Sequence, residues 1–171
     1  SGLAPSVVGL TRCGRSVVEI SPTGLPLRAI YGALPGRVQT VPRAEYFAGL
    51  KALEVAARPA HVVSVHLSLV RAGQNWGPAN ERSSSRHACV WRRAHALYDQ
   101  CEPPTYEWTP AHRKLQDVLE DSASDVLHWL GNSWADLFAR LGADGHAVAE
   151  VLVDFHKRKL ADAKATAKVF A

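Results

Sequence analysis

The sequence predicts an α/β domain, and three features of the chain favour this class. Two short runs of apolar and β-branched residues, 15–21 and 27–34, are separated by the turn-forming stretch SPTGLP, which predicts an antiparallel hairpin. A helix is expected over about 42–57. The near-continuous β-branched run HVVSVHL, residues 61–67, is typical of a buried parallel strand. Together these segments give the strand, helix, strand order of an α/β unit.

Composition limits the classes of function. The chain has 171 residues, of which 47% are hydrophobic and 21% are charged, so one domain with a sizeable core is expected. A net charge of +4 permits a polyanionic partner without requiring one. No apolar run approaches the roughly 18 residues of a membrane span, so no membrane partner is expected. The three cysteines have no CxxC spacing, which favours a reducing, intracellular compartment such as the cytoplasm or nucleus.

The middle of the chain continues the alternation of helix and strand. An amphipathic helix is expected over about 86–100, with Arg92 and Arg93 on its polar side. These arginines could contact phosphates, and a solvated helix face is the alternative. The segment TYEWT, residues 105–109, has strand propensity and follows the breaker Pro103-Pro104.

The C-terminal third is expected to be helical. A helix over about 125–142, capped by Ser124, places apolar side chains at helical spacing. Residues 144–171 are expected to form a basic helical extension rather than a domain, while residues 1–143 form the domain. The basic residues of the extension are Lys157, Arg158, Lys159, Lys164 and Lys168.

An acid lies among apolar neighbours in the stretch VPRAEYFAGLKAL, residues 41–53. On a helical period Glu45 falls in line with Ala48, Gly49 and Ala52, a face suited to packing on a sheet. A carboxylate buried there is costly unless something such as a metal ion pairs with it. Alternatively, Glu45 lies in the first turn just after Pro42, where a negative charge favours the helix dipole and remains wet.

Two further polar residues could carry chemistry. Asn132, Asp136 and Arg140 fall at i, i+4 and i+8, so they predict either a functional face or a solvated face with an Asp136–Arg140 ion pair. His112 follows a predicted strand end in WTPAH, a place where loops commonly carry functional groups. A loop histidine that is merely exposed is the alternative.

The order of these elements, together with the motifs QTVPRAE, WTPAH and GNSWADLFA, resembles type 1 ribonuclease H. The resemblance is strongest to the ribonuclease H domains attached to retroelement reverse transcriptases, and it covers residues 1 to about 143. It implies a ribonuclease H-like mixed sheet of five strands flanked by helices, in the order 3-2-1-4-5. It also implies a two-metal Mg²⁺ site that hydrolyses the RNA strand of RNA–DNA hybrids, within a longer retroelement polyprotein.

The same resemblance assigns roles to residues of this chain. Glu45 matches the helix glutamate of the family and Asp136 its last aspartate, so both are expected to be catalytic and to bind metal. His112 matches the loop histidine that helps with proton or product handling. Asn132, with Arg92 and Arg93, is expected to contact nucleic acid.

Two departures from the family pattern bear on catalysis. The first-strand aspartate of the family belongs to an Asp-Gly-Ser step, and Ser1-Gly2 resembles the sequence just after it, so the first, central strand is expected to be missing or incomplete. Val65 stands at the position of another aspartate and cannot bind a metal. By strand alternation His66 is expected to face the other side of the sheet, so it is not a replacement ligand.

These departures leave more than one function open. With two of the four carboxylates absent, the Mg²⁺ site is expected to be impaired. The leading interpretation is a ribonuclease H-like domain whose hydrolytic activity is in question. The alternatives are a noncatalytic nucleic-acid-binding or structural remnant of a retroelement polyprotein and, less favoured, an unrelated α/β small-molecule domain.

Overall fold

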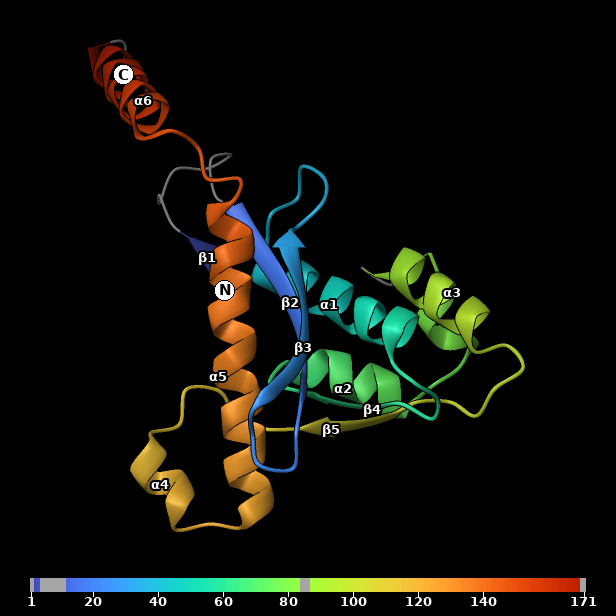
Figure 1. Ribbon diagram of the computed structural model, residues 1–171. Helices are drawn as coiled ribbons and strands as arrows, with labels where there is room; N and C mark the ends of the chain where they lie inside the picture. Colours follow the sequence, from blue (N-terminus) through green and yellow to red (C-terminus); the bar gives the residue numbers. More distant parts are fainter. Residues whose placement is uncertain (1, 4–11, 84–86, 170–171) are drawn as a thin grey trace.

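The computed structural model describes residues 2–3, 12–83 and 87–169. Its strands and helices alternate along much of the chain (Figure 1). In chain order they are β1 (Gly2–Leu3), β2 (Arg12–Ile20), β3 (Pro26–Ala33), α1 (Val41–Val55), β4 (His61–Ser64), α2 (Leu67–Gln74), the 3₁₀ helix η1 (Pro78–Glu81), α3 (Ala88–Leu97), β5 (Thr105–Trp108), α4 (Leu115–Leu119), α5 (Ala123–Asp144) and α6 (Glu150–Val169).

The described strands form two separate sheets. Strands β1, β2 and β3 pair antiparallel in that order, while β4 and β5 pair parallel with Val62 opposite Tyr106. The single five-stranded mixed sheet implied by the sequence resemblance is therefore not continuous in this part of the chain. The division falls between β2 and β4, and Glu45, Val65 and Asp136 lie around it.

The hairpin predicted near the N-terminus is present and longer than expected. Strand β2 begins at Arg12 and pairs with β3 up to the turn after Ile20. Gly24 closes that turn with a φ of 80°, a left-handed conformation that favours glycine. The Leu25 amide also donates to Ser21 Oγ at 3.1 Å, which holds the turn in place.

Helix α1 begins one residue earlier than the sequence suggests. Thr40 precedes its first residue, Val41, and Pro42 occupies the second position rather than the first. Glu45 therefore lies in the second turn, where it is half-buried rather than fully exposed. The interpretation of Glu45 as a solvated first-turn acid is wrong for this reason.

Strand β4 is shorter than its β-branched sequence predicts. It ends at Ser64, because His66 begins helix α2: the His66 Nδ1 atom accepts a hydrogen bond from the Leu69 amide at 3.2 Å. Burial lowers the pKa of His66, which favours the neutral imidazole that this cap requires. His66 is thus a helix-capping residue, and the alternation argument that placed it on the far face of a strand does not apply.

Two clusters of buried side chains lie on either side of the division between the sheets. The larger one joins α1, α2, α3 and β5, and the smaller one consists of Cys13, Leu34 and Ala44 beside β2 and β3. Phe47 of α1 packs against both clusters. Helix α1 therefore links the two halves of the domain. The members of the larger cluster are Tyr46, Leu50, Leu53, Ala60, Leu69, Val70, Val90, Trp91, Ala94, Tyr98 and Tyr106.

Helix α5 lies across the hairpin at backbone-contact distance. A Cβ atom built on Gly14 would lie 1.8 Å from the Ala139 carbonyl oxygen, and one built on Gly142 would lie 2.6 Å from the Gly32 carbonyl oxygen. Ser16 Oγ of β2 donates to the Ala135 carbonyl at 2.5 Å. Only glycine allows this approach, which brings the polar residues of α5 against β2. The helix is capped by Ser122 in a reciprocal pair with Asp125, not by Ser124 as predicted.

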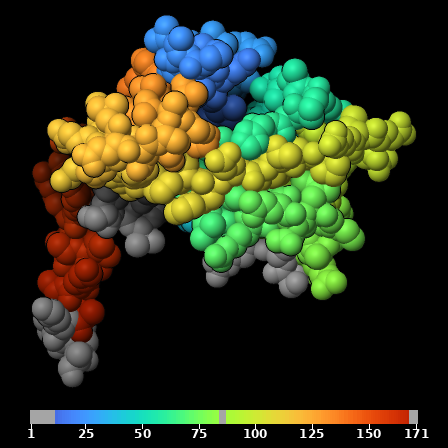
Figure 2. All heavy atoms as spheres, turned by 90° about the horizontal axis from the view of Figure 1, so that it is seen from below, coloured from blue at the N-terminus to red at the C-terminus, as the bar shows by residue number. Residues whose placement is uncertain are grey.

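The C-terminal helix α6 extends away from the rest of the molecule (Figures 1 and 2). It contains the expected basic residues 157–159 and 164, which are exposed. Of the helices in the described residues, none combines the length and apolar character that crossing a membrane requires.

Substituting Gly14 by alanine should destabilise the protein by about 1–3 kcal/mol, because the added methyl group meets main-chain atoms of α5 that cannot rotate away. Gly32→Ala is the matched control in the same hairpin, since no atom lies within 4 Å of a Cβ built there. Its free energy of unfolding should change by less than about 0.5 kcal/mol. Chemical denaturation measures both, and equal effects would contradict the packing of α5 on β2.

Candidate functional site

A cavity of about 660 Å³ lies between the two sheets. Residues of β2 and β4 line it, together with one face each of α1 and α5. Protein interiors are usually close-packed, with few voids larger than a water molecule. A cavity of this size in the middle of the domain is therefore the first place to look for a site.

Two carboxylates from distant parts of the sequence meet at this cavity. Glu45 reaches it from α1 and Asp136 from α5, with Asn132 one helical turn before Asp136. Burial raises the pKa of Glu45, and the negative charge of Asp136 raises it further. The two side chains are thus close enough to repel one another. None of the ion pairs in the described part of the chain joins Asp136 to Arg140, so the solvated-pair interpretation does not describe these two residues.

Val65 lines the same cavity, immediately after the end of β4. Its side chain is half-buried, and its carbonyl oxygen accepts a hydrogen bond from Trp108 Nε1 at 3.1 Å. An isopropyl group supplies no metal ligand where a carboxylate would complete the set. Within residues 2–3, 12–83 and 87–169, no group of three or more His, Cys, Asp or Glu side chains is arranged to hold a metal ion.

His112 is not among the residues that line the cavity. It is exposed, in the loop between β5 and α4, and its φ of 56° is uncommon for a residue other than glycine. Its assignment to the site stays a prediction.

The two arginines of α3 lie on the exposed side of that helix. Arg93 pairs with Glu54 of α1 at 2.6 Å and so fastens α3 to α1. Arg92 Nε donates to the Ala88 carbonyl in the same helix at 3.4 Å. Both guanidinium groups keep access to solvent, and their contact with nucleic acid stays a prediction.

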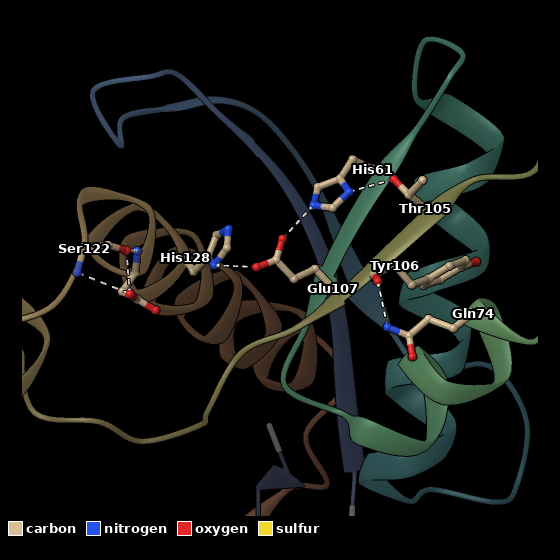
Figure 3. A network of polar contacts seen from close by, with 8 residues as sticks. His61, Gln74, Thr105, Tyr106, Glu107, Ser122 and His128 are labelled. Atoms are coloured by element: carbon tan, nitrogen blue, oxygen red, sulfur yellow. Dashed lines mark hydrogen bonds and ion pairs between the residues drawn. The ribbon is translucent and has the colours of Figure 1, made fainter.

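A polar network at one end of the cavity was not predicted from the sequence (Figure 3). His61 of β4 contacts Thr105 Oγ1 at 2.7 Å and Glu107 at 3.2 Å, and His128 of α5 lies 3.6 Å from the other oxygen of Glu107. His61 and His128 both line the cavity. The network depends on the parallel register that sets His61 beside Thr105, which no local sequence signal reveals.

No family model and no curated protein matches the sequence. Among solved structures, the chain is similar to the RNase H domain of prototype foamy virus (PFV), with a TM-score of 0.61 and 17% identity over 84% of this chain and 89% of that domain. The chain has a ribonuclease H-like fold. It is also similar to the prototype foamy virus protease–reverse transcriptase, with a TM-score of 0.51 and 17% identity over 77% of this chain. It spans about 20% of that longer protein.

At 17% identity the similarity to a ribonuclease H domain establishes the fold alone. Whether Glu45 and Asp136 can bind a metal must be argued from their own chemistry. Glu45 and Asp136 offer four carboxylate oxygens from two facing helices, without a cationic partner for either group among the described ion pairs. A hard cation such as Mg²⁺ prefers oxygen ligands and would relieve their mutual repulsion. The two residues therefore fit a cation, although they make a smaller donor set than two ions require.

Glu45→Gln should stabilise the protein at pH 7 in the absence of divalent cations. The ordinary pKa of this side chain is 4.5, and burial raises it, so the folded chain holds the proton more tightly than the unfolded chain does. The free energy of unfolding therefore falls as the pH rises from about 4.5 through the raised pKa, and the substitution removes that loss.

Thermal denaturation between pH 4 and pH 7 measures this difference. The two proteins should be about equally stable near pH 4 and should diverge above it. Glu102→Gln, at an exposed position, should show no such divergence. Parallel pH profiles for wild type and Glu45→Gln would show that Glu45 is not held in a costly environment.

Proposed function

We propose that this chain is a retroelement ribonuclease H-type domain that binds RNA–DNA hybrids and whose acidic site is incomplete for hydrolysis. The observation that supports the proposal most strongly is the meeting of Glu45 and Asp136 in one cavity beside Val65. The ribonuclease H-like fold makes a hybrid duplex the polyanion of first interest. The mildly basic composition is compatible with such a partner.

Glu45 and Asp136 would hold a Mg²⁺ ion between α1 and α5. When bound in such a site, the ion supplies charge neutralisation at a phosphate and lowers the pKa of a coordinated water. Mg²⁺ commonly takes only one or two carboxylates from the protein and completes its shell with waters and phosphate oxygens. Asn132, which lines the cavity beside Asp136, could donate a hydrogen bond to the same phosphate group.

Hydrolysis with two metal ions requires more carboxylate ligands than Glu45 and Asp136 provide. Two divalent ions about 3.5–4 Å apart repel one another strongly, and bridging carboxylates offset that repulsion. Val65 contributes no charge at the position where the family supplies one. Hybrid binding assisted by one ion is therefore the function that these residues support best, and efficient cleavage is not expected.

The phosphate contacts of the proposed complex would come from basic groups outside the cavity. Arg92 and Arg93 are exposed on α3, and Lys157, Arg158 and Lys159 are exposed on α6. Contacts of this kind depend on charge rather than on sequence, and they weaken as salt is added.

Mg²⁺ should tighten binding of the chain to an RNA–DNA hybrid, and Glu45→Gln with Asp136→Asn should abolish the increment. The expected change is about tenfold, typical of the coupling between two ligands that share a site. Fluorescence anisotropy with a labelled hybrid, with and without Mg²⁺, measures it. Asp99→Asn with Glu102→Gln removes the same charge at exposed positions and should retain the increment. The site would be contradicted if the Mg²⁺-dependent gain in affinity survived Glu45→Gln with Asp136→Asn and was lost in Asp99→Asn with Glu102→Gln.

Cleavage should require an acid at the Val65 position together with an aspartate in the Asp-Gly-Ser register of the family before Ser1. The chain carrying Val65→Asp and an Asp-Gly dipeptide joined before Ser1 should gain Mg²⁺-dependent cleavage of the RNA strand, by about 100-fold or more over either change alone. A gel assay on a labelled hybrid measures the rate. An unpaired buried acid is costly, so the folding of each variant must be checked with and without Mg²⁺.

Val65→Asn is the matched control, since it has nearly the shape of aspartate without the charge. It should give no gain in the same extended chain. Strong cleavage by the extended chain that keeps Val65, lost on Glu45→Gln, would show that another group supplies the missing ligand.

A further inference from the structure

Glu107 of strand β5 lies between two histidines from different elements (Figure 3). Its Oε2 atom lies 3.2 Å from His61 Nε2 of β4, and its Oε1 atom lies 3.6 Å from His128 Nδ1 of α5. Within the described residues, these three side chains are not arranged to hold a metal ion. The carboxylate is therefore the group that the two histidines share.

His61 holds Glu107 whether or not the imidazole is charged. Its Nδ1 atom contacts Thr105 Oγ1 at 2.7 Å. A neutral imidazole donates from one nitrogen and accepts at the other, so Nε2 can donate to Glu107 while Nδ1 accepts from the Thr105 hydroxyl. These two contacts orient the carboxylate without a second proton on His61.

The contact between His128 and Glu107 is of a different kind. A separation of 3.6 Å is longer than an ordinary N–H···O hydrogen bond, so the attraction depends mainly on charge. The His128 side chain is 15% exposed, and that of Glu107 is 48% exposed. Burial disfavours a charged imidazole, and a nearby carboxylate favours it. Glu107 therefore offsets the cost of a positive charge at this largely buried position.

Helix α5 makes different contacts on its two sides. Toward the hairpin it packs closely, and Trp134 Nε1 donates to the Gly24 carbonyl at 3.2 Å. Toward β4 and β5 it borders the cavity. Among the hydrogen bonds and ion pairs of residues 2–3, 12–83 and 87–169, the contact of His128 with Glu107 is the one that joins α5 to either of these strands. This contact is therefore the polar link between α5 and the parallel sheet.

His128 lies on the same face of α5 as the polar residues of the candidate site. His128, Asn132 and Asp136 recur at every fourth position, and all three line the cavity. About two helical turns separate the first from the last. A shift or rotation of the helix at His128 is therefore carried along the same face to Asp136.

Other charged groups also act on His128. Hydrogen bonds with Ser122 lower the pKa of Asp125 on the preceding turn, and the charges of Arg113 and His128 lower it further. Arg113 itself pairs with Asp121. Because several charges surround His128, the effect of Glu107 must be measured separately from theirs. The other charged groups on elements that pack on α5 or line the cavity near it include Arg15 and Glu19 of β2, Arg28 of β3, Asp117 of α4 and Asp136 of α5 itself.

We propose that Glu107 and His128 form a pH-dependent latch, closed when His128 is protonated, that positions α5 against the parallel sheet. The closed latch holds the proton of His128 more tightly than the open one does. It is therefore favoured at low pH and lost as the pH rises through about 5 to 8, the range in which imidazoles ordinarily change charge. The latch concerns how α5 is held and does not depend on hybrid binding or cleavage.

A double-mutant cycle of Glu107→Gln and His128→Phe tests the latch in the full chain. Both substitutions nearly keep the shape of the side chain and remove its charge. At pH 5.5 their effects on the equilibrium constant of unfolding should differ from additivity by about threefold or more, as for a partly exposed ion pair. At pH 8 the deviation should be less than about twofold. Urea denaturation measures each constant.

The matched control cycle pairs Glu107→Gln with His156→Phe. His156 is exposed on α6, so the two effects should be additive at both pH values. Repeating the first cycle with EDTA should leave its deviation at pH 5.5 unchanged, because the latch needs a proton and no metal ion.

A second measurement uses the wild-type chain and requires no variant to fold. Amide hydrogen exchange followed by NMR gives the protection of Leu130, close to the latch, and of Leu141, where α5 lies against the hairpin. The ratio of the two cancels the intrinsic effect of pH on exchange. Protection of Leu130 relative to Leu141 should fall by about threefold or more from pH 5.5 to pH 8.

Four results would overturn the proposal. Equal deviations from additivity at pH 5.5 and pH 8 would mean that the contact needs no charge on His128. Additivity at both pH values would mean that the two residues are not coupled. Loss of the deviation in EDTA would mean that a metal ion joins them. A constant ratio of protection between Leu130 and Leu141 would mean that pH does not alter how α5 is held.

Discussion

The contact between helix α5 and strand β2 fixes the position of everything around the cavity. Gly14 of β2 approaches the main chain of α5, and Gly142 of α5 approaches Gly32 of β3, to distances that a side chain would forbid. Ser16 of β2 adds a hydrogen bond to the Ala135 carbonyl. Because the helix is held there, Asn132 and Asp136 are directed toward α1 and Glu45. A side chain at Gly14 or Gly142 would push the helix away from the hairpin and so change the position of Asp136 relative to Glu45.

The cost of this arrangement is electrostatic. Two carboxylates meet in a partly buried site, and the raised pKa of Glu45 records both its burial and the charge of Asp136. Such a cost persists where function requires it, and a cation is the simplest group that offsets it. Under the proposed function, Val65 leaves the acidic set too small for two ions, because an isopropyl group supplies no ligand where the family has a carboxylate.

Local sequence patterns predicted the individual helices and strands better than their packing against one another. The hairpin, the helix that carries Glu45 and the helix that carries Asp136 follow from turn residues and apolar periodicity. The sequence could not show that β4 stops at Ser64, because the cap that His66 provides to α2 competes with the strand propensity of the residues around it. Nor could it show the network of His61, Glu107 and His128, which needs the parallel register of β4 and β5. The convergence of Glu45 and Asp136 was accessible only through family resemblance, since nothing in the spacing of the two residues requires it.

The most direct measurement is an NMR titration of the Glu45 carboxyl group in the wild-type chain and in Asp136→Asn, without divalent cations. We expect the pKa of Glu45 to lie above its ordinary value of 4.5 and to fall when the neighbouring charge is removed. A Glu45 pKa at or below 4.5 that does not respond to Asp136→Asn would contradict the convergence of the two carboxylates, and with it the proposed site.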